Sequence, residues 1–176
     1  MTSGFLFPPA KWTNQRVRLY HGTLLMHAEN IIAAGVQVRL GRQNTDFGRG
    51  FYTTTVERQA QSWAHHAAKR VPGRVAAVVS FDVDRDALAA LQTLSFVRGS
   101  FDAEDFWSFV AHCRSGGLDH TRRGGRDWYD MVAGPVASSW RQRLLHADVD
   151  QISFHTSTAA ALLNNGKPVV SWMQNP

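Results

Sequence analysis

One stretch constrains the fold of this chain most strongly: residues 46–64, with the sequence DFGRGFYTTTVERQAQSWA. Gly48 and Gly50 form a loop that leads directly into an aromatic and β-branched run at 51–55, and this order predicts a short strand. A helix is expected after the strand, with Thr55 as its N-cap. Its apolar face should hold residues spaced three and four apart, namely Ala60, Trp63, Ala64 and Ala67.

Glycines immediately before an aromatic strand allow the backbone to approach a flat ligand closely, and the aromatic ring can then stack on that ligand. A phosphate-binding loop is excluded here, because the P-loop and the dinucleotide fingerprint both need glycines that open directly into a helix N-terminus. An ordinary glycine turn before a core strand explains the same pattern. The segment alone therefore leaves a ligand-binding loop and a structural turn as alternatives.

The length and composition indicate one packed domain that comprises residues 1–176, with residues 1–15 as an N-terminal extension. Apolar residues make up 44% of the chain, and a chain of this length can bury about two-thirds of its unfolded surface. No apolar run approaches the roughly 20 residues of a membrane-spanning helix, and residues 4–12 lack the features of a signal peptide. The expected location is therefore the cytoplasm, with no membrane partner.

The cysteine content agrees with a reducing compartment such as the cytoplasm. Cys113 is the only cysteine, so we expect no internal disulfide and no multi-cysteine metal site. It follows the apolar face formed by Phe109 and Val110 in a predicted helix, which favours a buried structural thiol over a nucleophile.

The chain is basic. It carries 19 basic and 14 acidic side chains, a formal net charge of +5, and its isoelectric point is about 10.0. This charge permits an anionic partner such as a dinucleotide, a nucleic acid or an acidic protein, without selecting among them. Four arginines and four glycines fall within residues 114–127, RSGGLDHTRRGGRD. This loop is expected either to close over phosphate groups or to form a solvated surface loop.

Strand-like and helix-like segments alternate irregularly along the rest of the chain. Strands are predicted at 16–21, 36–40, 75–83, 91–97, 129–136, 151–155 and 169–173. Helices are predicted at 23–35 with Thr23 as N-cap, from Ser100 through Val110, from Ser138 or Ser139 through Leu144, and from 156–158 through Leu163. The apolar run at 75–83 should be a central strand covered on both faces. Because no regular βαβ repeat appears, we expect an α+β domain.

Two of these strands carry polar side chains in informative positions. His21 shares a strand face with Val17 and Leu19, so it is either a core histidine satisfied by a backbone carbonyl or a functional residue. In the strand at 151–155, Ile152 and Phe154 point to one side. The opposite side carries Gln151, Ser153 and His155. That polar face is expected to border solvent or to line a cleft.

Four blocks of the sequence, in order, resemble the DUF3990 family of the ADP-ribosyltransferase superfamily. The blocks are YHGT at 20–23, DFGRGFYTT at 46–54, YDMVAGPVA at 129–137 and QISFHT at 151–156. The resemblance extends over residues 19–163, and four ordered blocks are far more specific than any one of them.

The resemblance implies a split β-sheet fold, with two packed, mostly antiparallel sheets, flanking helices and a central cleft for NAD. It places the chain in the branch whose signature is His, Tyr and then Glu, Asp or Gln, so the implied catalytic residues are His21, Tyr52 and Gln151. His21 would bond the adenosine-side ribose, the Gly22 backbone would hold the nicotinamide amide, Tyr52 would stack on the nicotinamide ring and Gln151 would meet the 2′-hydroxyl of the nicotinamide ribose. The residues implied to bind the dinucleotide are His21, Gly22, Thr23, Asp46, Phe47, Gly50, Phe51, Tyr52 and Thr53.

These residue types suit cleavage of the bond between nicotinamide and ribose, because an oxocarbenium-like transition state needs a clamp on the leaving ring and polar groups on the ribose. Many relatives have a glutamate where this chain has Gln151. A glutamine amide can orient a hydroxyl, but it carries no charge and cannot act as a general base. Three alternatives follow: an acceptor activated elsewhere, with Asp46, Asp130 or Asp150 nearest in sequence; an acceptor that needs little deprotonation; or NAD binding without turnover.

The resemblance thus implies an NAD-dependent mono-ADP-ribosyltransferase that acts as an intracellular toxin in a toxin–antitoxin or phage-defence module. Its partners would be a cognate antitoxin and a macromolecular acceptor, with nucleic acid slightly favoured over protein by the basic charge. NAD would be the co-substrate, and no metal is expected. The alternatives are an NAD glycohydrolase, with water as acceptor, and an inactive NAD-binding or protein-interaction module.

Overall fold

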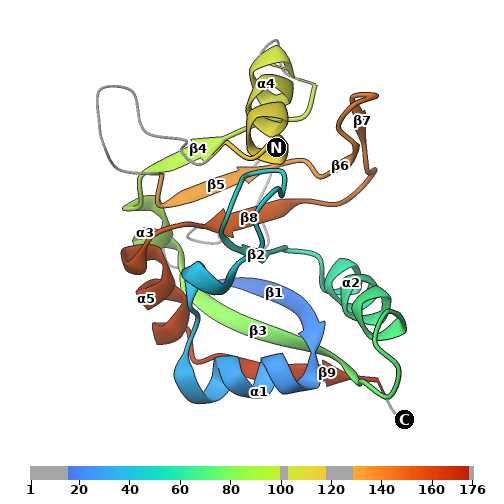
Figure 1. Ribbon diagram of the computed structural model, residues 1–176. Coiled ribbons are helices and arrows are strands. Elements are labelled where there is room, and N and C mark those ends of the chain that lie inside the picture. The colour runs from blue at the N-terminus through green and yellow to red at the C-terminus, as the bar shows by residue number, and fades with distance from the viewer. Residues whose placement is uncertain (1–15, 100–102, 118–128, 175–176) are drawn as a thin grey trace, which may run out of the picture.

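The computed structural model describes residues 16–99, 103–117 and 129–174 (Figure 1). The predicted N-terminal extension at 1–15, the predicted helix start at Ser100 and residues 118–127 of the arginine-rich loop lie outside these ranges.

The first sheet, sheet A, consists of β1 (Arg16–Leu24), β3 (Ala76–Asp84) and β9 (Val169–Met173), in the order β1-β3-β9. Both pairings are antiparallel. β3 is buried from Ala76 to Phe81, because helices cover both of its faces. The prediction of a central strand at 75–83 is confirmed.

The second sheet, sheet B, consists of β2 (Phe51–Thr53), β8 (Gln151–Phe154), β5 (Met131–Gly134) and β4 (Thr93–Ser95), in the order β2-β8-β5-β4. Only the pairing of β4 with β5 is parallel. The backbones of the two sheets meet at a bridge, where Tyr20 and Thr54 exchange two hydrogen bonds of 2.8 and 2.9 Å. Side chains also join the sheets, since Phe51 and Phe154 of sheet B pack in one core cluster with Phe81 of sheet A. Figure 1 shows β2 beside β1 at this junction.

Helices cover the sheets in separate hydrophobic clusters. On sheet A, α1 (Leu25–Ala34) and α5 (Ser157–Asn165) pack on one face, while α2 (Glu57–Lys69) packs on the other, where Ala60 and Ala64 meet Val78. On sheet B, α4 (Ala103–Arg114) packs through Phe106 and Val110. The short α3 (Arg85–Ala89) follows β3 and is capped by the Asp84 carboxylate. The chain therefore has the expected α+β fold, with two main sheets that are mostly antiparallel and a separate two-stranded sheet described below. None of the described helices is both long and apolar enough to cross a membrane.

Two predicted elements are wrong. Residues 36–40 do not form a strand, since Val38–Leu40 is a turn of 3-10 helix. The predicted helix from Ser138 or Ser139 to Leu144 is instead a hairpin of β6 (Ala137–Ser139) and β7 (Leu144–Leu145). The left-handed backbone of Arg143, with φ of 54°, accounts for the turn, because a helix cannot contain such a residue.

The helix starts also differ from prediction. α1 has Leu24 as its N-cap, without a side-chain hydrogen bond, and α2 has Val56. Thr55 does not cap α2, since its own N–H and hydroxyl both donate to Asp150. Trp63 was expected on the buried face of α2 but is 51% exposed, because the small Ala60 and Ala64 alone bring the helix close to sheet A. Cys113 is buried, as expected of a structural thiol, and burial raises its pKa to about 12.

Candidate functional site

The candidate site lies where β1 separates from β2. Leu25 N–H donates to the Val75 carbonyl beyond β3, whereas Tyr20 N–H donates to Thr54 on the opposite side. Backbone groups alternate between the two edges of an antiparallel strand, so the N–H and C=O of Gly22 point to the same edge as those of Tyr20. Continued pairing would bring Gly22 opposite Tyr52, but the bridge at Tyr20 and Thr54 is isolated. The split between the sheets therefore begins at Gly22.

Gly22 is required at this position by close packing. A Cβ atom there would lie 2.0 Å from the Ala60 carbonyl oxygen of α2, far inside contact distance. The helix thus presses directly on one face of Gly22, while its backbone polar groups point along the sheet plane into the split.

His21 closes the inner side of the split. Its Nδ1 lies 2.7 Å from the Tyr52 carbonyl oxygen. Because a carbonyl only accepts, Nδ1 carries the proton of the neutral ring, and Nε2 is left as an acceptor. Burial lowers the pKa of His21 below its ordinary value of 6.5, so the ring is neutral at pH 7. The ring packs on Phe51 with centroids 4.3 Å apart.

This geometry bears on both interpretations of His21. The backbone hydrogen bond expected of a core histidine is present, and it joins the two residues that flank the split. The side chain is largely buried without being sealed, so a role toward a ligand stays a prediction.

Tyr52 is held by its hydroxyl. The oxygen accepts a hydrogen bond from Phe47 N–H (2.9 Å), donates to the Gly48 carbonyl (2.8 Å) and lies 2.8 Å from the Thr45 hydroxyl. Burial raises the pKa of Tyr52, so the phenol stays protonated throughout the neutral range. The hydroxyl is committed to loop 45–48, and Phe47 is stacked on the ring with centroids 6.4 Å apart. Only the part of the Tyr52 ring away from Phe47 can therefore contact a ligand.

Gln151 is held by its amide nitrogen. Nε2 donates to Asp46 Oδ2 and to the Pro135 carbonyl, both at 2.8 Å. Gln151 is 8% exposed and Asp46 only 3%. The side chains of Tyr52 and Gln151 lie on the same face of sheet B, because Tyr52 pairs with Ser153, two residues from Gln151.

Asp46 is a junction of four donors. Its Oδ2 accepts from Gln151 and from Ala137 N–H (2.9 Å), and its Oδ1 accepts from Nε (2.8 Å) and Nη2 (2.6 Å) of Arg114. Three consecutive residues of the loop thus fix both candidate catalytic side chains, since Asp46 holds Gln151 while Phe47 and Gly48 hold Tyr52. The sequence pointed to Asp46 and Phe47 but not to this supporting role, and it placed Arg114 in a loop, whereas Arg114 is the last residue of α4 and binds Asp46.

The structure brings together some of the predicted site residues and places others behind them. His21, Gly22, Phe51 and Tyr52 meet at the split, and Gln151 adjoins Tyr52 through the loop. Thr23 lies on β1 one residue beyond Gly22. Besides Gln151, the predicted site residues that are buried are Asp46, Phe47, Gly50 and Thr53. In this conformation they support the site instead of facing a ligand.

The polar face of β8 does not border solvent. Ser153 is fully buried and its hydroxyl lies 2.7 Å from Nε2 of His155, whose Nδ1 lies 2.8 Å from the Arg49 carbonyl. A Cβ on Gly50 would lie 2.8 Å from the His155 ring, so the glycine loop packs directly over this face. The solvent alternative is therefore wrong, and the close approach that the glycines permit is to the protein's own histidine.

The three carboxylates nearest to Gln151 in the prediction all have structural partners. Asp46 binds Arg114, Asp150 accepts from the N–H and hydroxyl of Thr55, and Asp130 accepts from Gln92 N–H and the Thr156 hydroxyl. The structure thus gives a supporting role to each residue proposed as a general base.

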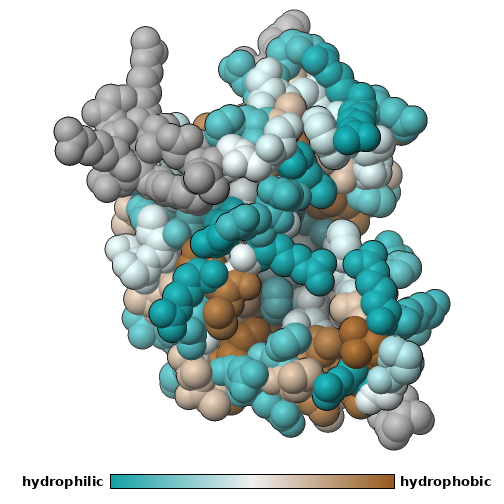
Figure 2. All heavy atoms as spheres, in the orientation of Figure 1, coloured by the Kyte–Doolittle hydropathy of each residue, from teal (hydrophilic) through white to brown (hydrophobic). Residues whose placement is uncertain are grey.

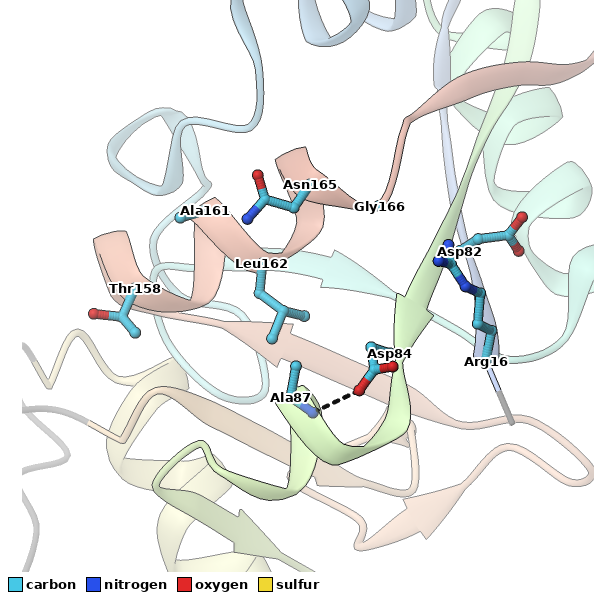
Figure 3. A pocket seen from close by; sticks show the side chains of 9 residues that line it. All are labelled: Arg16, Asp82, Asp84, Ala87, Thr158, Ala161, Leu162, Asn165 and Gly166. Carbon is cyan, nitrogen blue, oxygen red and sulfur yellow. Dashed lines mark hydrogen bonds between the residues drawn. The ribbon is translucent and has the colours of Figure 1, made fainter. Parts of the chain in front are cut away.

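A separate cavity of about 280 Å³ lies at the far end of sheet A (Figure 3). Its walls include Asp84 and Asn165, together with apolar residues of α3 and α5, and Asp84 is committed to capping α3. None of the predicted site residues lines it. We assign the site to the split because, within the described residues, the edge of β1 at Gly22 has no pairing strand there, and His21 and Tyr52 lie beside it. Figure 2 shows the surface hollowed over the middle of β1. In the described ranges no group of His, Cys, Asp and Glu side chains could hold a metal ion.

A family model matches most of the chain. The family model for Protein of unknown function (DUF3990) matches residues 17–147, which include His21, Gly22, Asp46 and Tyr52 and end before Gln151. No curated protein matches the chain.

Proposed function

The chain belongs to the DUF3990 family, and from this premise and the geometry of the split we propose that it is an ADP-ribosyltransferase with NAD as its co-substrate. Membership of the ADP-ribosyltransferase superfamily, and the branch with a His, Tyr, Gln signature, are part of this proposal. His21, Tyr52 and Gln151 come from three different strands. The contact of His21 with the Tyr52 carbonyl, and the link between Tyr52 and Gln151 through loop residues 46 and 47, support the proposal.

The observation that carries the proposal is the hydrogen-bonding edge at Gly22. Its N–H and C=O point side by side into the split, across from Tyr52. A carboxamide presents one acceptor and one donor group, so it complements such a pair of backbone groups. Nicotinamide has this carboxamide on a flat ring, and the ring of Tyr52 supplies a face for stacking.

Departure of the leaving group needs no general acid from the protein. When the C–N bond between ribose and nicotinamide breaks, the electron pair goes to the pyridinium nitrogen, and nicotinamide leaves as a neutral molecule without being protonated. The ribose C1′ becomes electron-poor, the acceptor forms the new bond and the acceptor loses its proton. Gln151 Oε1 would accept from the ribose 2′-hydroxyl, and His21 Nε2 from the adenosine-side ribose.

We further propose that the acceptor is macromolecular and that the protein acts in the cytoplasm as a toxin with a cognate antitoxin, in a toxin–antitoxin or phage-defence module. The net charge of +5 supports a nucleic-acid acceptor slightly over a protein. Water as acceptor would make the protein an NAD glycohydrolase, and binding without cleavage would make it an interaction module.

The test is incubation of the protein with NAD labelled in its adenylate half and a cell lysate, followed by protease or nuclease treatment. Label that nuclease releases from macromolecules supports the favoured acceptor, and free ADP-ribose alone supports the glycohydrolase. Tyr52→Ala should abolish nicotinamide release and His21→Ala should raise the KM for NAD, whereas the remote Asp82→Asn should change neither. Full activity of both site variants would refute the assignment.

A further inference from the structure

The buried partners of Gln151 give a structural reason for a glutamine at this position. We propose that Asp46, itself held by Arg114, is a positioning residue that fixes the Gln151 amide with its oxygen toward the substrate, and that this pairing disfavours an ionised glutamate at position 151. This inference rests on the proposed function for its catalytic part. The pairing itself can be tested without NAD.

The orientation of the amide is forced by its neighbours. The two groups at 2.8 Å from Gln151 Nε2 are a carboxylate oxygen of Asp46 and the Pro135 carbonyl. Both groups only accept hydrogen bonds at neutral pH, so the amide nitrogen must face them and Oε1 must face away. In the described part of the chain Oε1 has no hydrogen-bond partner, although Gln151 is only 8% exposed. A buried amide oxygen without a partner is costly, and a hydroxyl donor from a ligand would satisfy it.

Asp46 cannot release Gln151 by turning. Rotation of its carboxylate would also break the bond to Ala137 N–H and the two-pronged contact with Arg114. The carboxylate is almost fully buried, so no water replaces those partners. Arg114 therefore affects the site only by holding Asp46, and it does not itself contact the substrate.

The same contacts oppose an ionised glutamate at position 151. A carboxylate in place of the Gln151 amide would put an acceptor oxygen about 2.8 Å from two other acceptors, one of them charged. Two buried carboxylates this close share a proton instead of both ionising. In its protonated form, a glutamate at this position could donate to Asp46 and turn its C=O toward the substrate, as Gln151 does. The native glutamine thus supplies, at neutral pH, a permanent donor toward Asp46 and a permanent acceptor toward a ribose hydroxyl.

The experiment compares wild type, Gln151→Glu, Asp46→Asn and the double variant, with Gln142→Glu on the exposed β6–β7 turn as the matched control. The initial rate of nicotinamide release from NAD is measured from pH 5.5 to 8.5. We expect Gln151→Glu to lose at least tenfold in kcat at pH 8 and to regain activity as the pH falls, because its proton bridges to Asp46. The double variant should lose this acid dependence, since the asparagine amide introduced at position 46 can donate to the ionised glutamate introduced at position 151. Gln142→Glu should match the wild type.

Thermal unfolding of the same set, over the same pH range, tests the pairing without NAD. Gln151→Glu should be less stable at pH 8 than at pH 6 relative to wild type, and Asp46→Asn in the double variant should reduce this difference. If Gln151→Glu equals wild type in stability and kcat at pH 8, the inference is overturned. If the stability pattern appears but wild type neither cleaves nor binds NAD, the proposed function fails, and with it the catalytic part, while the pairing stands.

Discussion

Two arginine–aspartate pairs in this protein show how burial changes what the same chemistry does. Arg18 and Asp82 face each other across β1 and β3 through two hydrogen bonds of 2.8 and 2.9 Å, with side chains 60% and 40% exposed. Arg114 binds Asp46 through two comparable contacts, but the Asp46 side chain is 2% exposed. The first pair joins neighbouring strands that are already paired. The second joins α4 to a loop and, through Asp46, to β6 and to β8 of sheet B.

The difference shows why only one of the pairs can organise a site. An exposed ion pair contributes little to the free energy of unfolding, because water solvates both side chains whether or not the pair forms. A buried carboxylate, in contrast, must find all its hydrogen-bond partners within the protein. Asp46 meets this requirement with donors from Arg114, Ala137 and Gln151. A strict requirement for partners fixes geometry, and fixed geometry is what a catalytic side chain needs.

Asp46→Ala removes the carboxylate of the buried pair and should lower the free energy of unfolding more than any other variant considered. It leaves the Arg114 guanidinium, the Gln151 amide and the Ala137 N–H without their shared acceptor. Removing one partner of a buried pair typically costs about 3–5 kcal/mol. Urea unfolding should show a loss of this size at unchanged slope; a loss below about 1 kcal/mol would contradict the role assigned to Asp46.

Tyr52→Phe tests the neighbouring anchor on the same loop. The phenol oxygen has three partners, and its removal leaves Phe47 N–H without an acceptor in a cluster where Phe47 itself is fully buried. We expect a destabilisation of about 1–3 kcal/mol, from the cost of an unsatisfied buried group. Because the ring remains, nicotinamide release should persist at a reduced rate, in contrast to Tyr52→Ala. Equal loss in both variants would show that the ring face is not the functional element.

The sequence predicted the strands of this site better than its connections. The alternation at 16–21 and 151–155 and the aromatic run at 51–55 placed β1, β8 and β2, because period-two patterns and β-branched residues are local signals. The contact of Asp46 with Gln151 spans 105 positions and that with Arg114 spans 68, so no local pattern contains them. The hairpin at 137–145 was missed for a related reason. Its turn includes Arg143 in the left-handed backbone conformation, and arginine is not a residue type that indicates a turn.

The pH dependence of the free energy of unfolding tests whether His21 is held neutral in the folded protein. Burial holds the pKa of His21 below 6.5 in the folded protein, so the unfolded chain binds a proton first as the pH falls. The free energy of unfolding should therefore decrease as the pH falls through 6.5, down to the lowered pKa. His21→Asn keeps a donor for the Tyr52 carbonyl and cannot titrate, so the decrease should be smaller in this variant. The check is urea unfolding at pH 5.5, 6.5 and 7.5; identical pH profiles of wild type and variant would show that His21 is not held neutral.

Asp82→Asn neutralises the carboxylate of the exposed pair and should have the smallest effect on stability. Arg18 lowers the pKa of Asp82, so any stabilisation from their pair is present above pH 3.8 and is lost as the pH falls through the lowered pKa. At pH 7 both side chains keep their contact with water, and the asparagine introduced at position 82 still presents an oxygen to Arg18. The thermal midpoint of this variant at pH 7 should equal that of wild type within error, while Asp46→Asn, the same substitution in the buried pair, should lower it clearly. A comparable loss in the two variants would mean that the charge of the carboxylate, and not its burial, decides the stability of both regions.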